Sequence, residues 1–207
     1  MTPTLRIVVF VALALSACTG GSDPPGSGPL ASAPPTTYPA GVGLLTHVSE
    51  VHGDLANEAR DRIPTLAGDA IDGYFQRAFL STSTDTMDSA FGVFTPGAAE
   101  QARAEADVTT NQELGPGMEA IWADRYEVTL TVLARDGAAQ GGTAQVAFEA
   151  KGVHRVEGNV HLGVYGWLYL TVDGAGAWKI MGYHLNQKST TDAPEITSTV
   201  TSTVTTK

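Results

Sequence analysis

The sequence predicts an α+β domain in which helices come first and a curved antiparallel sheet of at least four strands follows. Between residues 66 and 80, apolar residues recur at spacings of three and four, which is typical of a helix that buries one face, and residues 98–107 are rich in helix-forming residues. After residue 121 the spacing becomes two, which is typical of strands. Helices and strands that occupy separate parts of a chain indicate the α+β class.

The clearest helix is expected over residues 66–80. Its apolar stripe comprises Leu66, Ala70, Ile71, Tyr74, Phe75, Ala78 and Phe79. Thr65 or Asp69 is placed to cap its start. A second helical stretch is expected over residues 87–94. Thr95 and Pro96 then suit the N-cap and first position of a third helix, which continues through residues 98–107.

Upstream, residues 42–51 alternate partially and favour a strand, and residues 55–62 favour a short helix. Downstream, the first long strand turns one face inward. The next strand follows a predicted hairpin loop over residues 136–142 and does the same. The expected inward residues of these two strands are Tyr126, Val128, Leu130, Val132, Ala144, Val146, Phe148 and Ala150.

The third strand, residues 159–172, is apolar or aromatic at both even and odd positions. A strand with two such faces is expected to be central and covered on both sides. Asp173-Gly174-Ala175-Gly176 then turns the chain, and the last strand is predicted over residues 178–185.

The N-terminus has the pattern of an export signal. A short apolar run, residues 7–15, follows Arg6 and is too short to span about 30 Å of hydrocarbon. It ends in Leu15-Ser16-Ala17-Cys18, which resembles the lipobox of bacterial lipoproteins. The resemblance implies diacylglycerol on Cys18, cleavage before that residue, and a lipid-anchored protein on the extracytoplasmic side of the cell membrane. An ordinary secretory signal with a chance cysteine is the alternative.

Composition divides the chain into four segments. Residues 1–17 are the expected signal peptide, and residues 18–40 are a Pro/Gly/Ser-rich segment that we interpret as a disordered tether. Residues 41–188 are the expected folded domain. Residues 189–207, rich in Thr and Ser, are interpreted as a disordered tail, although their Thr and Val also suit a short strand and the composition is compatible with O-glycosylation.

Charge and cysteine content narrow the functional classes. Twelve basic and 22 acidic side chains give a formal net charge of -10, which argues against a nucleic-acid partner and against electrostatic docking on anionic lipid. The single cysteine cannot form an internal disulfide. If Cys18 is lipidated, it is also unavailable as a nucleophile. We expect neither a metal nor a cofactor other than the covalent lipid.

The folded part resembles the NTF2-like (cystatin-like) superfamily, including the membrane-anchored Mce-associated group. The likeness covers about residues 64–187 and is carried by Ala70-Ile71-Asp72-Gly73-Tyr74-Phe75 and by residues 173–183, Asp-Gly-Ala-Gly-Ala-Trp-Lys-Ile-Met-Gly-Tyr. It implies a cone in which helices fill the hollow of a curved sheet. Such cones often pair through the open sheet face, so a homodimer is one expected partner arrangement.

Several side chains are candidates for chemistry. In enzymes of this superfamily an Asp or His inside the cone acts as the base and a Tyr or Asp donates to the oxyanion. Tyr74, Tyr126, His161, Tyr165 and His184 come nearest, with His161, His184 and Tyr74 as the main catalytic candidates. A second group comprises Tyr165, Trp167 and Tyr169, which could line an apolar pocket, offer a platform for sugar rings, or pack under a helix near Phe75 and Phe79.

Metal ligands are not grouped in a recognisable pattern. His47 and His52 lie near Glu50 and Asp54 but are best interpreted as surface residues. His154 and His161 fall on neighbouring strands at opposite parity, so they are expected to face opposite sides of the sheet.

Two functions remain open from the sequence. The first is a non-catalytic envelope lipoprotein that binds or scaffolds a partner protein or an apolar small molecule. The alternative is a small isomerase, cyclase or dehydratase with a His or Asp base in the cone.

Overall fold

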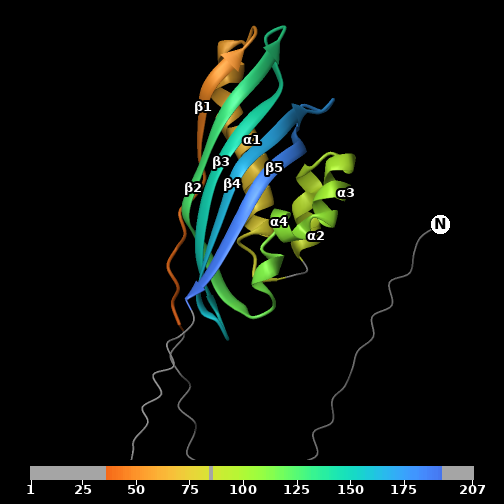
Figure 1. Cartoon of the computed structure of the whole chain (residues 1–207). Helices are drawn as coiled ribbons and strands as arrows, with labels where there is room; N and C mark the ends of the chain where they lie inside the picture. The colour runs from red at the N-terminus through yellow and green to blue at the C-terminus, as the bar shows by residue number, and fades with distance from the viewer. Residues whose placement is uncertain (1–35, 84–85, 193–207) are drawn as a thin grey trace, which may run out of the picture. The chain divides into compact units, whose positions relative to one another are not determined.

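The computed structural model describes residues 36–83 and 86–192, which form a five-stranded sheet with helices on one face (Figure 1). The strands are β1 (Leu45–His52), β2 (Met118–Arg135), β3 (Ala138–His154), β4 (Gly158–Val172) and β5 (Trp178–Asp192), and they lie side by side in this order. The α+β class is therefore confirmed.

The sheet is mixed, and the prediction of a purely antiparallel sheet was wrong. β2 to β5 form an antiparallel meander, but β1 pairs with β2 in parallel. The helical region between β1 and β2 carries the chain back to the end at which β1 started, so β2 runs in the same direction. The expected strand at residues 42–51 is thus present as an edge strand.

Helix α1 (Asn57–Ala78) is one continuous helix where the sequence predicts two separate ones, over residues 55–62 and 66–80. Pro64 lies inside it, and the start at Asn57 has no side-chain cap, so Thr65 and Asp69 do not cap it. A proline in a helix removes one backbone hydrogen bond. The helix continues because Ile63, on one side of Pro64, and Ala67, on the other, are both buried against the sheet side.

Short helical pieces follow and lie near β5 (Figure 1). They are α2 (Met87–Ala90), the 3-10 turn η2 (Phe91–Val93), α3 (Pro96–Ala104), α4 (Ala106–Thr109) and the 3-10 turn η3 (Gln112–Leu114). Thr95 and Pro96 take the expected N-cap and first positions of α3. The predicted continuous helix through residue 107 breaks at Glu105, and the hydroxyl of Thr109 donates to the carbonyl of Ala102 across this break at 2.7 Å.

The β2–β3 hairpin is tighter than predicted. Asp136 and Gly137 have φ of 52° and 79°, the left-handed conformation that a two-residue hairpin turn requires. β3 therefore begins at Ala138, not after a loop that ends at Gly142.

β5 is also longer than predicted, because Ser189–Asp192 pair with Leu162–Asn159 of β4. The first four residues of the segment that we expected to be a disordered tail therefore belong to this strand. The rest of that segment, residues 193–207, and most of the expected tether lie outside the described residues.

The core fills the space between the helices and the face of the sheet that they cover, which we call the inner face. The expected inward residues of β2 and β3, from Tyr126 to Ala150, are all buried there. In β4 the even positions Val160, Leu162, Val164, Leu168 and Leu170 are buried as well. Within residues 36–83 and 86–192, no helix has the length and apolar composition needed to cross a membrane.

Candidate functional site

The inner face is closed by aromatic side chains. Phe75 of α1 has its ring centroid 5.0 Å from that of Phe148 and 5.2 Å from that of Tyr126. Tyr74 meets Phe94 edge-on at 4.9 Å. These spacings are those of packed aromatic cores, so side chains fill the space between α1 and the inner face of the sheet.

The two tyrosines of this cluster use their hydroxyl groups to satisfy backbone carbonyls. Tyr74 Oη donates to the carbonyl of Thr109 at 2.7 Å, and Tyr126 Oη donates to that of Ile71 at 3.4 Å. Burial raises the pKa of both phenols well above the ordinary value. Tyr74, a predicted catalytic candidate, therefore acts here as a structural link between α1 and α4.

The other catalytic candidates lie on the opposite side of the sheet. His161 and His184 are exposed on the outer face, and His161 Nε2 lies 3.6 Å from Asp192 Oδ2. The sheet thus separates both histidines from Tyr74, and the structure does not bring the three candidates together.

The other histidines lie apart from one another. His154 is buried on the inner side, so the prediction that it and His161 face opposite sides is confirmed. His52 Nε2 lies 3.4 Å from Glu50 Oε2 on β1. Within residues 36–83 and 86–192, no three His, Cys, Asp or Glu side chains are grouped as metal ligands.

The outer face carries the aromatic stripe, defined as Tyr165, Trp167 and Tyr169 of β4. These side chains are 40%, 41% and 42% exposed, so the expectation that they pack under a helix and that β4 is covered on both sides was wrong. Val164 and Leu168 already face inward, and strand alternation then turns the odd positions away from the helices.

Polar side chains border the stripe on both sides. Trp167 pairs with Gln145 of β3 and His184 of β5, Tyr169 pairs with Thr143, and Tyr165 pairs with Asn186. The extra residue of a bulge in β5, Met181, lies beside the Tyr169 pair and is 55% exposed.

A shallow hollow of about 240 Å³ adjoins the Tyr165 end of the stripe. Tyr165 Oη donates to Glu149 Oε1 at 2.6 Å, which raises the pKa of this tyrosine. Lys151 Nζ pairs with Asp124 Oδ2 at 2.8 Å. The hollow also includes His161, Lys188 and Thr190, so both acidic and basic groups line it.

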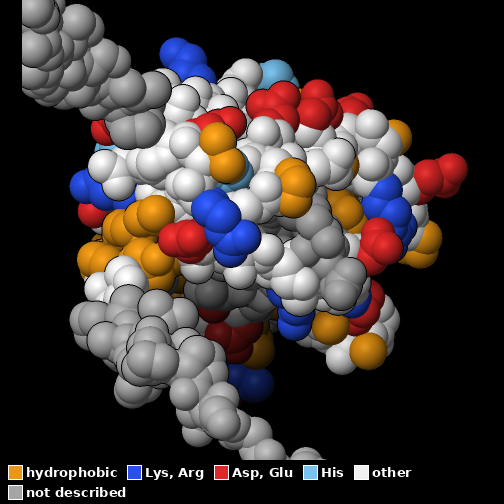
Figure 2. Space-filling view, turned by 90° about the horizontal axis from the view of Figure 1, so that it is seen from below, with side chains coloured by type: hydrophobic (Ala, Val, Ile, Leu, Met, Phe, Trp, Pro, Cys, Tyr) orange, Lys and Arg blue, Asp and Glu red, His pale blue; other side chains and the backbone are white. Residues whose placement is uncertain are grey.

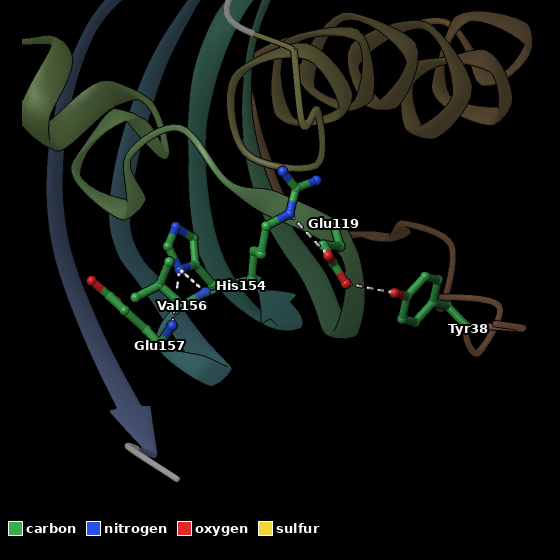
Figure 3. A network of polar contacts seen from close by, with 6 residues as sticks. Tyr38, Glu119, His154, Val156 and Glu157 are labelled. Carbon is green, nitrogen blue, oxygen red and sulfur yellow. Dashed lines mark hydrogen bonds and ion pairs between the residues drawn. The ribbon is translucent and has the colours of Figure 1, made fainter. Parts of the chain in front are cut away.

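A third feature lies at the end of the sheet where the described chain begins (Figure 3). Glu119 accepts hydrogen bonds from Tyr38 Oη and Arg155 Nε, both at 3.3 Å, and the ring of Tyr38 stacks on Trp122 with centroids 6.2 Å apart. The amide of Val42 also donates to the carbonyl of Ala123 at 2.9 Å. Residues 38–42 are therefore fixed along β2, although we assigned residues 38–40 to a disordered tether.

His154 fixes the hairpin beside this contact. Its Nδ1 accepts from the amides of Val156 and Glu157 at 3.3 and 3.1 Å (Figure 3). Seen from below, hydrophobic side chains gather at one side of this end, and acidic and basic side chains are interspersed over the rest (Figure 2).

Asn111 has a structural role that sequence reasoning missed. Its amide nitrogen donates to the carbonyls of Phe79 and Ser81, and its backbone N–H donates to that of Ala78. These carbonyls belong to the end of α1, where helices leave acceptors without partners. A lone Asn in a loop gives no pattern from which this contact could be predicted.

Comparison with known proteins gives no match, either to family models, to curated proteins or to solved structures.

Proposed function

We propose that this chain is an exported lipoprotein, anchored through Cys18, whose folded domain binds a component of the cell envelope through the aromatic stripe of its outer face. The observation that carries the binding part is the exposure of Tyr165, Trp167 and Tyr169 on one strand face. Exposed apolar groups that are gathered in one place mark interaction sites more often than chance would give.

The anchoring part rests on the first residues of the sequence. The apolar run, the lipobox-like Leu15-Ser16-Ala17-Cys18 and the Pro/Gly/Ser-rich segment after it support a lipid anchor followed by a spacer. A flexible spacer of this length has an end-to-end distance of about 25 Å. The domain would then work away from the lipid headgroups.

We also propose that the domain is an NTF2-like cone. Support comes from α1, which packs on the inner face of a long meander, and from the closing segment around Trp178, whose side chain is buried. The filled inner face favours a binding role over catalysis inside the cone.

Anchoring is tested by mass spectrometry of the mature N-terminus from bacterial cells that express the full chain. We expect Cys18 as the first residue, carrying diacylglycerol. An unmodified Cys18, or cleavage at another bond, contradicts the anchor.

Binding is tested with a photoreactive amino acid in place of Trp167 in the full chain, irradiated in intact cells. We expect a cross-linked adduct from this position. The matched control places the same amino acid at Val156, which is 77% exposed at the tip of the β3–β4 hairpin and outside the stripe. Equal yields at both positions would contradict a binding role for the stripe.

A further inference from the structure

The stripe presents open ring surfaces. The ring of Tyr165 leans over Gly163, where an added Cβ would come within 2.9 Å of ring atom Cε2. The ring of Tyr169 lies beside Gly182, where an added Cβ would be 3.4 Å from Cδ2. Because these two glycines leave the space free, the rings can lie along the sheet and turn a face to solvent. Such faces carry partial negative charge and attract the weakly positive hydrogens of C–H groups.

The three rings are also held in line. Alternate residues of a strand lie on one face at about 3.3–3.4 Å per residue, so the stripe extends for about 13 Å. β4 is paired with β3 on one side and with β5 on the other over this whole length. A linear ligand of several rings could therefore contact all three side chains without any movement of the backbone.

The stripe is flanked mainly by polar groups that form hydrogen bonds, and one of them, the carboxylate of Glu149, accepts from Tyr165 Oη. Gln145 and Thr143 flank it from β3, and His184 and Asn186 flank it from β5. The centre of a protein–protein interface is mostly apolar, whereas beside these rings Met181 is the only exposed large aliphatic side chain among the described residues. Aromatic faces bordered by amides, hydroxyls and imidazole match a ligand that has both C–H faces and hydroxyl edges.

Several of the nearby acidic and basic side chains are paired with each other. Arg125 Nη2 lies 2.8 Å from Glu127 Oε2, and Lys151 Nζ lies 2.8 Å from Asp124 Oδ2. A strongly charged ligand would have to replace these pairs, and an uncharged ligand would not.

We infer that the ligand of the stripe is an extended, uncharged glycan whose sugar rings stack on Tyr165, Trp167 and Tyr169. This inference rests on the proposed function, because it names the class of partner for the same face. The flanking amide, hydroxyl and imidazole groups then bind the hydroxyl edges of the sugars.

The test uses the full chain, purified in mild detergent, and a panel of linear β-1,4-linked hexasaccharides of glucose, N-acetylglucosamine, mannose and xylose. Binding is measured by titration calorimetry. We expect at least one saccharide to bind, and we expect Trp167→Ala to weaken that binding about tenfold, which corresponds to a stacking loss of about 1.4 kcal/mol. Tyr165→Ala and Tyr169→Ala should each weaken it about fivefold.

Two control variants keep the result specific. Leu133→Ala removes an exposed apolar side chain from the same sheet outside the stripe, and Trp122→Phe removes a different tryptophan. Both should bind the saccharide as the unchanged chain does. Circular dichroism checks that every variant is folded. Loss of binding in the controls as well, or no binding to any saccharide of the panel, overturns the inference.

The photo-cross-link at position 167 separates this inference from the proposed function. If glycoside hydrolases remove mass from the cross-linked partner and proteases do not, the partner is a glycan. This result supports both the glycan inference and the proposed function. An adduct with a protein, including a second copy of this chain, together with no saccharide binding, overturns the glycan but keeps the binding face. If there is no adduct and no saccharide binds, both the glycan inference and the proposed binding role of the stripe are overturned.

Discussion

The two faces of the sheet use aromatic side chains in opposite ways. On the inner face, Phe75, Tyr126 and Phe148 lie with ring centroids about 5 Å apart and are shielded from water. On the outer face, Tyr165, Trp167 and Tyr169 are about two-fifths exposed, and none of their rings is packed against another aromatic ring of the described residues. The same type of residue is thus fully buried on one face and partly exposed to water on the other.

This difference indicates which aromatics are held for stability and which are available for binding. A ring that leaves water on folding contributes to the free energy of folding. A ring that stays in water contributes little and increases the risk of association. The comparison therefore assigns the inner aromatics to the fold, and under the proposed function it leaves the outer stripe for a ligand. Substitutions can break or sharpen this division.

The largest difference is expected between Phe148→Ala and Trp167→Ala. Loss of the fully buried Phe148 ring should lower the free energy of unfolding by about 3–5 kcal/mol. Loss of the exposed Trp167 ring should change it by about 0.5 kcal/mol. Urea unfolding of the purified full chain measures both. If Trp167→Ala destabilises as much as Phe148→Ala, the outer ring belongs to the fold and the division fails.

The stability of the fold should fall at high pH, because two phenols of the inner face are buried. Burial raises the pKa of Tyr74 and Tyr126 above the ordinary value of 10.0. Above that value the unfolded chain releases these protons while the folded chain keeps them, so stability falls as pH rises. The contribution of each tyrosine should approach about 1.4 kcal/mol per pH unit well above pH 10.0.

Urea unfolding between pH 9.5 and 11 measures this slope. Tyr126→Phe should reduce it by the share of one tyrosine, whereas Tyr165→Phe, on the exposed stripe, should leave most of it in place. An unchanged slope in Tyr126→Phe would show that this phenol is not the source.

Removal of one hydroxyl gives a finer comparison of the faces. Tyr74→Phe leaves the carbonyl of Thr109 buried without its hydrogen bond and should lower the free energy of unfolding by about 1–3 kcal/mol. Tyr165→Phe removes a hydrogen bond to Glu149 at the surface, where water takes its place, so the change should be much smaller. Thermal melts of the two variants at pH 7 make the comparison, and equal losses would contradict it.

The smallest effect on global stability is expected at the end of the sheet. Tyr38→Ala removes the stack on Trp122 and the hydrogen bond to Glu119, both at the surface. The melting midpoint should stay close to that of the unchanged chain, but residues 36–42 should be cleaved faster by a protease. Glu119→Gln is the matched variant, because it keeps the stack. Unaltered cleavage in Tyr38→Ala would mean that this contact does not hold the segment.

Local pattern predicted most of the sheet correctly. Alternation identified the inward side chains of β2 and β3, because in residues 126–132 and 144–150 every second residue is apolar and the others are polar or small. It failed for β4, since apolar content alone does not distinguish an aromatic side chain that is covered from one that is exposed to solvent. The parallel pairing of β1 with β2 could not be predicted either, because the paired residues are about eighty positions apart and no local pattern indicates the pairing.

The sequence identified the residues of the candidate site but not the face of the sheet on which they lie. Tyr165, Trp167 and Tyr169 were identified by their shared parity, and their exposure depends on the helices packing on the other face. The catalytic candidates were residues of suitable type whose positions were set by strand parity, which put His161 and His184 on the face away from Tyr74. Asn111 and the Tyr38–Glu119–Arg155 contact join distant segments, and only the tertiary structure reveals them.

If the domain is held by its N-terminus, as we propose, the parallel pairing of β1 with β2 has a mechanical consequence. Leu45 lies beside Glu127 and His52 beside Leu133, so the first strand runs along its neighbour in the same direction. A pull on the chain ahead of Tyr38 would act along β1 and load its hydrogen bonds to β2 together, in shear, and not one after another. A domain that grips a ligand while tethered would in this way resist being opened by the force that the ligand transmits.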